Sequence, residues 1–161
     1  MSEQKAKTGI SWNDVFGFDS SQLDAFAVLG SNLYEQGRTR DAAAIFEGLI
    51  ALDANNYYGY AGMGALALSE EKLDEAMDYL QTAVRLNPED PTVHANLGET
   101  LLRKAKFNEA AIEFEKALKL DPDERDPGAN RARGILQGME AVIKEVDRLN
   151  KLAGSGKGAT V

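Results

Sequence analysis

Apolar residues along most of the chain recur at steps of three and four positions, a spacing typical of amphipathic helices and not of strands. Turn and capping signals separate the periodic segments. Gly37 can end a helix in a left-handed conformation, and Asp90 followed by Pro91 supplies an N-cap and a proline at the first helical position. The pattern predicts an all-α protein with three helix pairs: 23–36 with 39–52, 57–70 with 73–86, and 91–104 with 107–120.

The helix pairs repeat with a period of 34 residues. A helix–turn–helix unit of this length is the signature of the tetratricopeptide repeat. The sequence therefore predicts a right-handed α-solenoid over residues 23–122, preceded by a short N-terminal helix and followed by a long C-terminal capping helix. The repeats are placed at 23–56, 57–90 and 91–124. Three series of residues align at this offset: Gly30, Gly64 and Gly98; Ala42, Ala76 and Ala110; Leu52, Leu86 and Leu120.

Packing within a repeat is predicted from side-chain size. Two antiparallel helices approach closely where side chains are small, so we expect the glycine of each first helix to face the alanine of the second. Large apolar residues are then expected to fill the wider gaps: Phe26, Leu29, Phe46, Leu97, Phe107 and Phe114. Because no repeat buries its apolar face alone, three repeats need a cover at each end.

The C-terminal cover is predicted as a helix over residues 126–152. Its start repeats the Asp-Pro signal, but the repeat pattern then fails. The favoured interpretation is a helix that covers the last repeat. The alternative is a heptad seam, with spacings 132–139–146 and 135–142–149, that pairs with a second chain. Residues 153–161 are expected to form a flexible tail. One face of the helix is apolar: Ala132, Ile135, Leu136, Met139, Val142, Ile143, Val146 and Leu149.

The N-terminal segment holds aromatic residues that belong to no repeat. Residues 1–10 are expected to be flexible, and residues 11–22 to form a docking segment that begins with a short helix. A helix of about one and a half turns is unstable alone, so it must pack against something. Three destinations stay open: the free edge of the first repeat, a second copy of the protein, and the protein's own groove. The candidate self-association residues are Trp12, Val15, Phe16 and Phe18.

Composition narrows the function. The length of 161 residues indicates one domain, and the net charge of −8 comes with no basic patch, so we expect no nucleic-acid partner. No cysteine is present, which excludes disulfides and thiol chemistry. The first ten residues lack the apolar core of a signal peptide, and no apolar run is long enough to cross a bilayer. We therefore expect a cytoplasmic protein without membrane insertion.

Candidate chemistry is sparse. The tail sequence GSGKGAT lacks the Ser or Thr that a phosphate-binding loop needs directly after its lysine. The single histidine, His94, is expected to be a packed structural residue and not a metal ligand, because no second metal-type cluster accompanies it. No nucleophile–base pair stands out. We expect no catalytic residue, no metal site, no cofactor and no enzymatic activity.

The first helices of the three repeats are expected to line a concave groove. The positions that face it are small and apolar with two tyrosines, and they carry no cationic group. Such a surface suits an extended client peptide with apolar anchors. The candidate peptide-binding residues are Ala27, Ser31, Tyr34, Tyr58, Ala61, Ala65, Leu68, Thr92, Ala95, Glu99 and Leu102.

The stretch LYEQGRTRDAAAIFEGLIALDANNYYGYAGMGA resembles the type III secretion translocator chaperones, the class II chaperones of bacterial injection systems. The resemblance implies a cytoplasmic chaperone that holds an apolar segment of a secreted client in the groove and forms a homodimer through its N-terminal region. The third repeat departs from that family toward the general consensus, so a scaffold or self-assembling interaction protein without a dedicated client is the alternative. The resemblance is carried by Leu33, Tyr34, Gly37, Ala42, Phe46, Leu49, Leu52, Asp53, Gly62 and Gly64.

Overall fold

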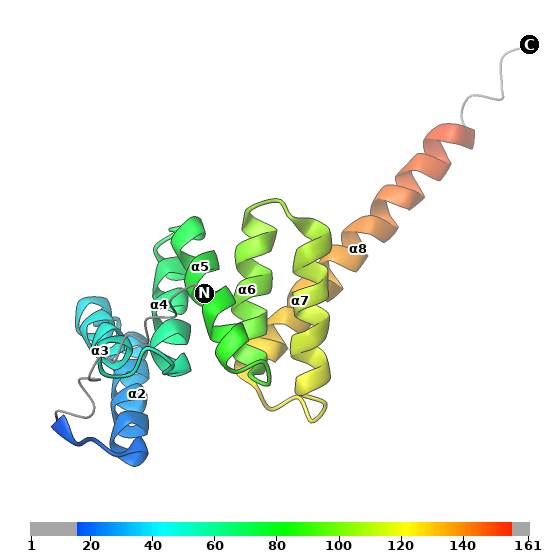
Figure 1. Ribbon diagram of the computed structural model, residues 1–161. Coiled ribbons are helices and arrows are strands. Elements are labelled where there is room, and N and C mark those ends of the chain that lie inside the picture. The colour runs from blue at the N-terminus through cyan, green and yellow to red at the C-terminus, as the bar shows by residue number, and fades with distance from the viewer. Residues whose placement is uncertain (1–15, 156–161) are drawn as a thin grey trace, which may run out of the picture. The chain divides into compact units, whose positions relative to one another are not determined.

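A computed structural model describes residues 16–155 of the chain, and all regular structure among them is helical (Figure 1). The repeat helices begin and end within three residues of the predicted positions, and the all-α fold is confirmed. The helices are α2 (Ser20–Glu35), α3 (Thr39–Leu52), α4 (Tyr57–Ser69), α5 (Leu73–Leu86), α6 (Pro91–Arg103), α7 (Phe107–Leu120) and α8 (Pro127–Ser155).

The chain divides into two compact units, one that ends at Pro88 and one that begins at Glu89. Unit 1 contains α2 to α5, and unit 2 contains α6 to α8. The length of the chain predicts a single domain, whereas the structure divides into these two compact units. Repeats in such arrays contact only their neighbours, so a short array can divide between two of them.

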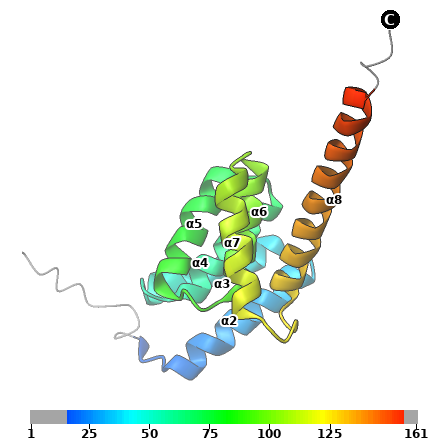
Figure 2. The same ribbon diagram turned by 90° about the vertical axis from the view of Figure 1, so that its right-hand side faces the viewer.

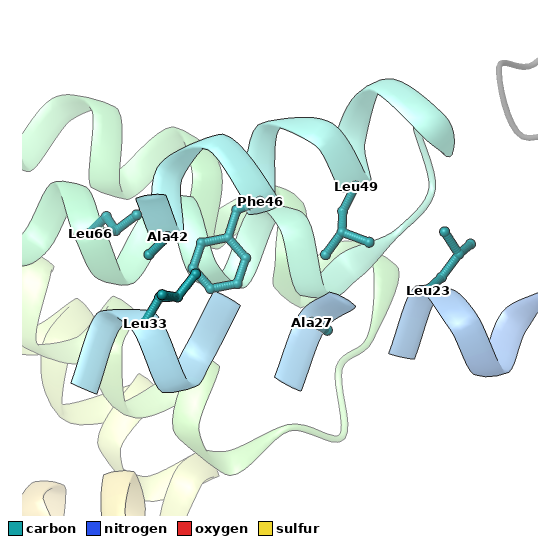
Figure 3. Close-up of a cluster of buried hydrophobic side chains, with 7 residues drawn as sticks. All are labelled: Leu23, Ala27, Leu33, Ala42, Phe46, Leu49 and Leu66. Carbon is teal, nitrogen blue, oxygen red and sulfur yellow. The ribbon is translucent and has the colours of Figure 1, made fainter. Parts of the chain in front are cut away.

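The core of unit 1 is built around the ring of Phe46 on α3, which is 3% exposed (Figure 3). A Cβ atom on Gly30 of α2 would lie 2.7 Å from this ring, and one on Gly62 of α4 would lie closer still. The two glycines therefore make room for one aromatic ring between three helices. The buried cluster comprises Leu23, Ala27, Leu33, Ala42, Phe46, Leu49 and Leu66.

The aligned glycines face large residues, and the prediction that they face alanines was wrong. Gly64 lies against Leu80, and Gly98 lies against Phe114, just as Gly30 lies against Phe46. A bulky side chain on the second helix fills the volume that the missing Cβ leaves on the first. Two residues predicted to fill gaps are exposed instead: Leu29 (44%) and Phe107 (56%).

The first half of α8 packs against α6 and α7, with Ala129 and Ala132 fully buried. Asp126 sets its start, because one carboxylate oxygen accepts a hydrogen bond from the Ala129 backbone N–H (2.7 Å). The other oxygen accepts from the Thr92 hydroxyl on α6 (2.8 Å). The second half of α8 extends beyond the ends of α6 and α7 (Figures 1 and 2).

Replacing Gly98 with alanine is expected to destabilise unit 2. The new Cβ would lie 2.6 Å from the buried Phe114 ring, and such overpacking costs about 1–3 kcal/mol. This exceeds the roughly 1 kcal/mol that alanine contributes as a better helix former. Urea denaturation followed by circular dichroism checks the change. The matched control is Gly134→Ala on α8, where a Cβ meets nothing within 4 Å and stability should hold or rise. Equal effects of the two substitutions would contradict the packing explanation.

Candidate functional site

The candidate groove residues of unit 1 lie on α2 and α4, two helices that contact each other directly. Ser31 and Tyr58 are exposed, and Tyr34, Ala61 and Ala65 are half-buried. These five residues are called the α2/α4 face below. On α4, positions 58, 61 and 65 follow helical spacing, so their side chains lie along one face of the helix.

Two of the predicted groove residues in unit 1 are not available to a ligand. Ala27 is 5% exposed and Leu68 is 6% exposed. Ala27 belongs to the buried cluster around Phe46. The prediction that these two residues line an open surface was therefore wrong.

Local contacts hold the α2/α4 face in place and leave it with little polar character. The Ser31 hydroxyl donates to the Ala27 carbonyl oxygen one turn earlier (3.1 Å), so its proton is already engaged. Asn56 caps α4 by accepting a hydrogen bond from the Gly59 N–H (3.2 Å). The Tyr58 ring packs on that of Tyr57, with 4.0 Å between centroids, which orients the exposed tyrosine. The face therefore offers mainly apolar contact area.

Two of the four predicted groove residues of the third repeat, Thr92 and Glu99, bond to residues at the start of α8. The Thr92 hydroxyl donates a hydrogen bond to the Asp126 carboxylate, and the Glu99 carboxylate forms an ion pair with Arg131 of α8 (3.1 Å). Ala95 is 1% exposed, so the prediction that it lines an open surface was wrong; Leu102 is half-buried. Periodicity within the repeats could not reveal this, because the partners come from outside the repeats.

The N-terminal aromatic residues are only partly described, since Trp12 and Val15 lie outside residues 16–155. Gly17 turns the chain with a positive φ of 69°, ahead of the capping box of Asp19 and Gln22 at the start of α2. Phe18 packs edge-on against Phe26 of α2, with 5.4 Å between ring centroids. Phe16 stacks on Phe18 and is 60% exposed. Phe18 thus packs on its own chain, and the exposed Phe16 packs on Phe18.

His94 is buried (3% exposed) and links α6 to α7. The Nδ1 atom of His94 lies 2.6 Å from the Oε2 atom of Glu113. The other carboxylate oxygen of Glu113 accepts a hydrogen bond from the Lys116 ammonium group (2.8 Å). Burial acts to raise the pKa of Glu113, but the hydrogen bonds from His94 and Lys116 outweigh it and hold the pKa below its ordinary value. Within residues 16–155 no group of three His, Cys, Asp or Glu residues is placed to hold a metal ion.

The Glu113 carboxylate is expected to make unit 2 sensitive to acid. Because its pKa is lowered on folding, its contribution to stability is present above the ordinary carboxyl pKa of about 4.3 and is lost as the pH falls through the folded-state value. Thermal melts of Glu113→Gln should show a smaller fall in Tm between about pH 5 and pH 3 than melts of the wild type. The exposed Glu115→Gln is the control. Identical pH profiles for wild type and Glu113→Gln would contradict the assignment.

A shallow hollow of about 270 Å³ lies among α3, α4 and α5 and is not anticipated by the repeat pattern. Ala43, Met63 and Tyr79 line its apolar part, and the ion pair between Lys72 and Glu70 (2.8 Å) lies at its border. Its charged lining distinguishes it from the α2/α4 face.

Comparison with protein families identifies the repeats. Two family models, both described as tetratricopeptide repeat, match residues 28–91 and 67–134, which together make up more than half of the chain. The chain is a tetratricopeptide repeat protein. The matched segments span α3 to α7 completely and include the first turns of α8. None of the helices within residues 16–155 is both long and apolar enough to cross a membrane.

Solved structures with the same fold include several from type III secretion. The Yersinia enterocolitica type III secretion translocator chaperone SycD is 22% identical, with a TM-score of 0.65 over 81% of this chain and 98% of that one. A T3SS complex from Aeromonas hydrophila is 22% identical, with a TM-score of 0.68 over 84% of this chain and 92% of that one. PcrH in complex with the chaperone binding region of PopB is 24% identical, with a TM-score of 0.61 over 73% of this chain and 97% of that one. No curated protein sequence matches the chain. The resemblance noted in the first two repeats is confirmed as a likeness of fold.

Proposed function

We propose that the protein is a non-catalytic, cytoplasmic secretion chaperone that holds an extended apolar segment of a client on the α2/α4 face. The observation that carries the proposal is the accessibility of Tyr58, 39% exposed, beside the half-buried Ala61 and Ala65 on one face of α4. The complex of PcrH with the chaperone binding region of PopB supports it, because a protein of the same fold is there bound to a client segment.

The chemistry of the α2/α4 face suits such a segment. Alanine leaves hollows that receive an apolar side chain of a peptide, and tyrosine supplies apolar area with a polar tip. None of the five residues is charged, so the face offers no fixed partner for a peptide carboxylate. Affinity is then expected to come from burial of apolar anchors and not from ion pairs.

The alternative is a scaffold without a dedicated client. The contacts of Thr92 and Glu99 with the start of α8 favour it, because side chains predicted to face a client are bonded within unit 2 instead. A scaffold needs no accessible apolar peptide site in unit 1. The two functions therefore differ in whether the purified protein selects peptides by their apolar residues.

Peptide selection tests the proposed function. The full chain, immobilised, is exposed to a displayed library of random 16-residue peptides. The proposal predicts enrichment of peptides with several apolar anchors that bind with dissociation constants of roughly micromolar order. Enrichment of no peptide, or only of highly charged peptides without apolar anchors, would overturn it.

A further inference from the structure

The second half of α8 carries large apolar side chains that its own unit does not bury. Ala129 and Ala132 at the start of the helix are buried, and Ile135, Leu136 and Met139 are half-buried. Beyond them the helix leaves α6 and α7 (Figures 1 and 2). The exposed fractions there are 64% for Val142, 59% for Ile143, 49% for Val146, 51% for Leu149 and 57% for Leu152.

These side chains are spaced for a helical partner. Ile135, Met139, Val142, Val146 and Leu149 follow alternating steps of four and three and are called the α8 seam below. This is the 3.5-residue spacing that keeps one face of a helix against another helix that has the same spacing. Leu136 and Ile143 widen the seam on one side. A partner that matches the seam is therefore an α-helix with a heptad stripe.

The charges on this half of α8 allow a second copy to approach. Residues 135–152 hold three acidic residues (Glu140, Glu145, Asp147) and three basic ones (Lys144, Arg148, Lys151), a net charge of zero on a chain of −8. Glu140 pairs with Lys144 (2.6 Å) and Glu145 with Arg148 (2.7 Å). Four of the six charges thus find partners within the helix, and because the six sum to zero, two such helices can meet without net repulsion.

We propose that the α8 seam of one chain pairs with the α8 seam of a second copy to form a short two-helix coiled coil. A second copy meets both requirements, because its α8 has the same heptad spacing and the same zero net charge over residues 135–152. A membrane surface does not fit, because helices that lie on membranes carry a basic polar face, and this one is balanced. The pairing leaves the α2/α4 face of unit 1 unused and is independent of the proposed peptide binding.

The seam from Ile135 to Leu149 covers 15 residues, about 22 Å of helix. Two heptads make a weak coiled coil, so the pairing depends on protein concentration. Sedimentation equilibrium of the purified full chain should show a mass that rises toward twice the chain mass between roughly 1 and 100 μM. A mass of one chain throughout this range would overturn the proposal.

Matched substitutions locate the contact. Val142→Asp with Leu149→Asp places two charges in the seam, whereas Gln137→Asp with Ala141→Asp places two on the opposite face of the same helix. In the seam variant the dissociation constant of the dimer should increase at least about tenfold, so its mass should no longer rise over this range. The opposite-face variant should show the same rise in mass as the wild type. Circular dichroism verifies that both retain helix, and binding of a selected peptide should be unchanged in both. Equal masses for the seam variant and the wild type would refute the pairing.

Disulfide trapping gives a second readout, because the chain has no cysteine. Val142 and Val146 are consecutive seam positions, so cysteines at both sites can bridge two chains in either relative direction of the helices. Val142→Cys with Val146→Cys should give a covalent dimer with copper phenanthroline and air, and Gln137→Cys with Ala141→Cys should not. No dimer, or an equal yield from both pairs, would count against the α8 seam as the interface. Loss of peptide binding with an intact dimer would refute only the proposed function.

Discussion

Replacing Phe46 with alanine is expected to lower the free energy of unfolding of unit 1 by about 3–5 kcal/mol. The ring is 3% exposed and lies against Gly30 of α2 and Gly62 of α4. These glycines have no side chain that could move into the space of the lost ring, so the cavity stays largely open. Since small domains are stable by about 5–15 kcal/mol, this loss removes much of the margin of unit 1.

Urea denaturation followed by circular dichroism measures this loss. Phe107→Ala is the matched control, because it removes the same side chain where it is 56% exposed and should cost less than about 1 kcal/mol. If both substitutions destabilised the protein equally, the ring of Phe46 would not be the packing centre that the two glycines indicate.

Replacing Ala61 with arginine is expected to weaken the binding of an apolar-anchored peptide by about 30-fold or more, equivalent to roughly 2 kcal/mol. The long cationic side chain covers the surface beside Tyr58 and places a charge where apolar side chains of the peptide are expected. Because Ala61 is half-buried at the surface of α4, the helix can carry the larger residue at its edge without losing its core. Fluorescence anisotropy with a labelled peptide selected from the library measures the effect.

Ala44→Arg on α3 is the matched control for Ala61→Arg. Ala44 is exposed and outside the α2/α4 face, so the same change of charge and size should alter peptide affinity less than about twofold. Equal losses from both variants would indicate a general electrostatic effect and contradict binding at the α2/α4 face. Thermal melts of both variants verify that they are folded.

The helices could be predicted from sequence because their signals are local. Asp19 and Gln22 form the capping box at the start of α2, and Asp90 with Pro91 starts α6, as the residue types indicate. The 34-residue period also pairs each first helix with its second. Local propensity, capping and apolar spacing all agree there, so the fold follows from short segments of the chain.

The tertiary details could not be predicted in the same way. The period aligns Gly30 with Gly64 and Gly98 but does not say what they face, and the structure places Phe46, Leu80 and Phe114 there.

The site was predicted only in part for the same reason. Thr92 and Glu99 occupy groove positions of their repeat, yet Asp126 and Arg131 from the C-terminal segment bind them. Such contacts depend on where a non-repeating helix packs, and repeat spacing carries no information about it.

Peptide binding at the α2/α4 face is tested most directly by mapping amide chemical shifts of the isotope-labelled full chain during titration with a selected apolar-anchored peptide. We predict the largest shift changes at Ser31, Tyr34, Tyr58, Ala61 and Ala65, with little change along α8. The largest changes at the hollow lined by Ala43, Met63 and Tyr79, or shift changes spread over the whole chain, would contradict binding at this face.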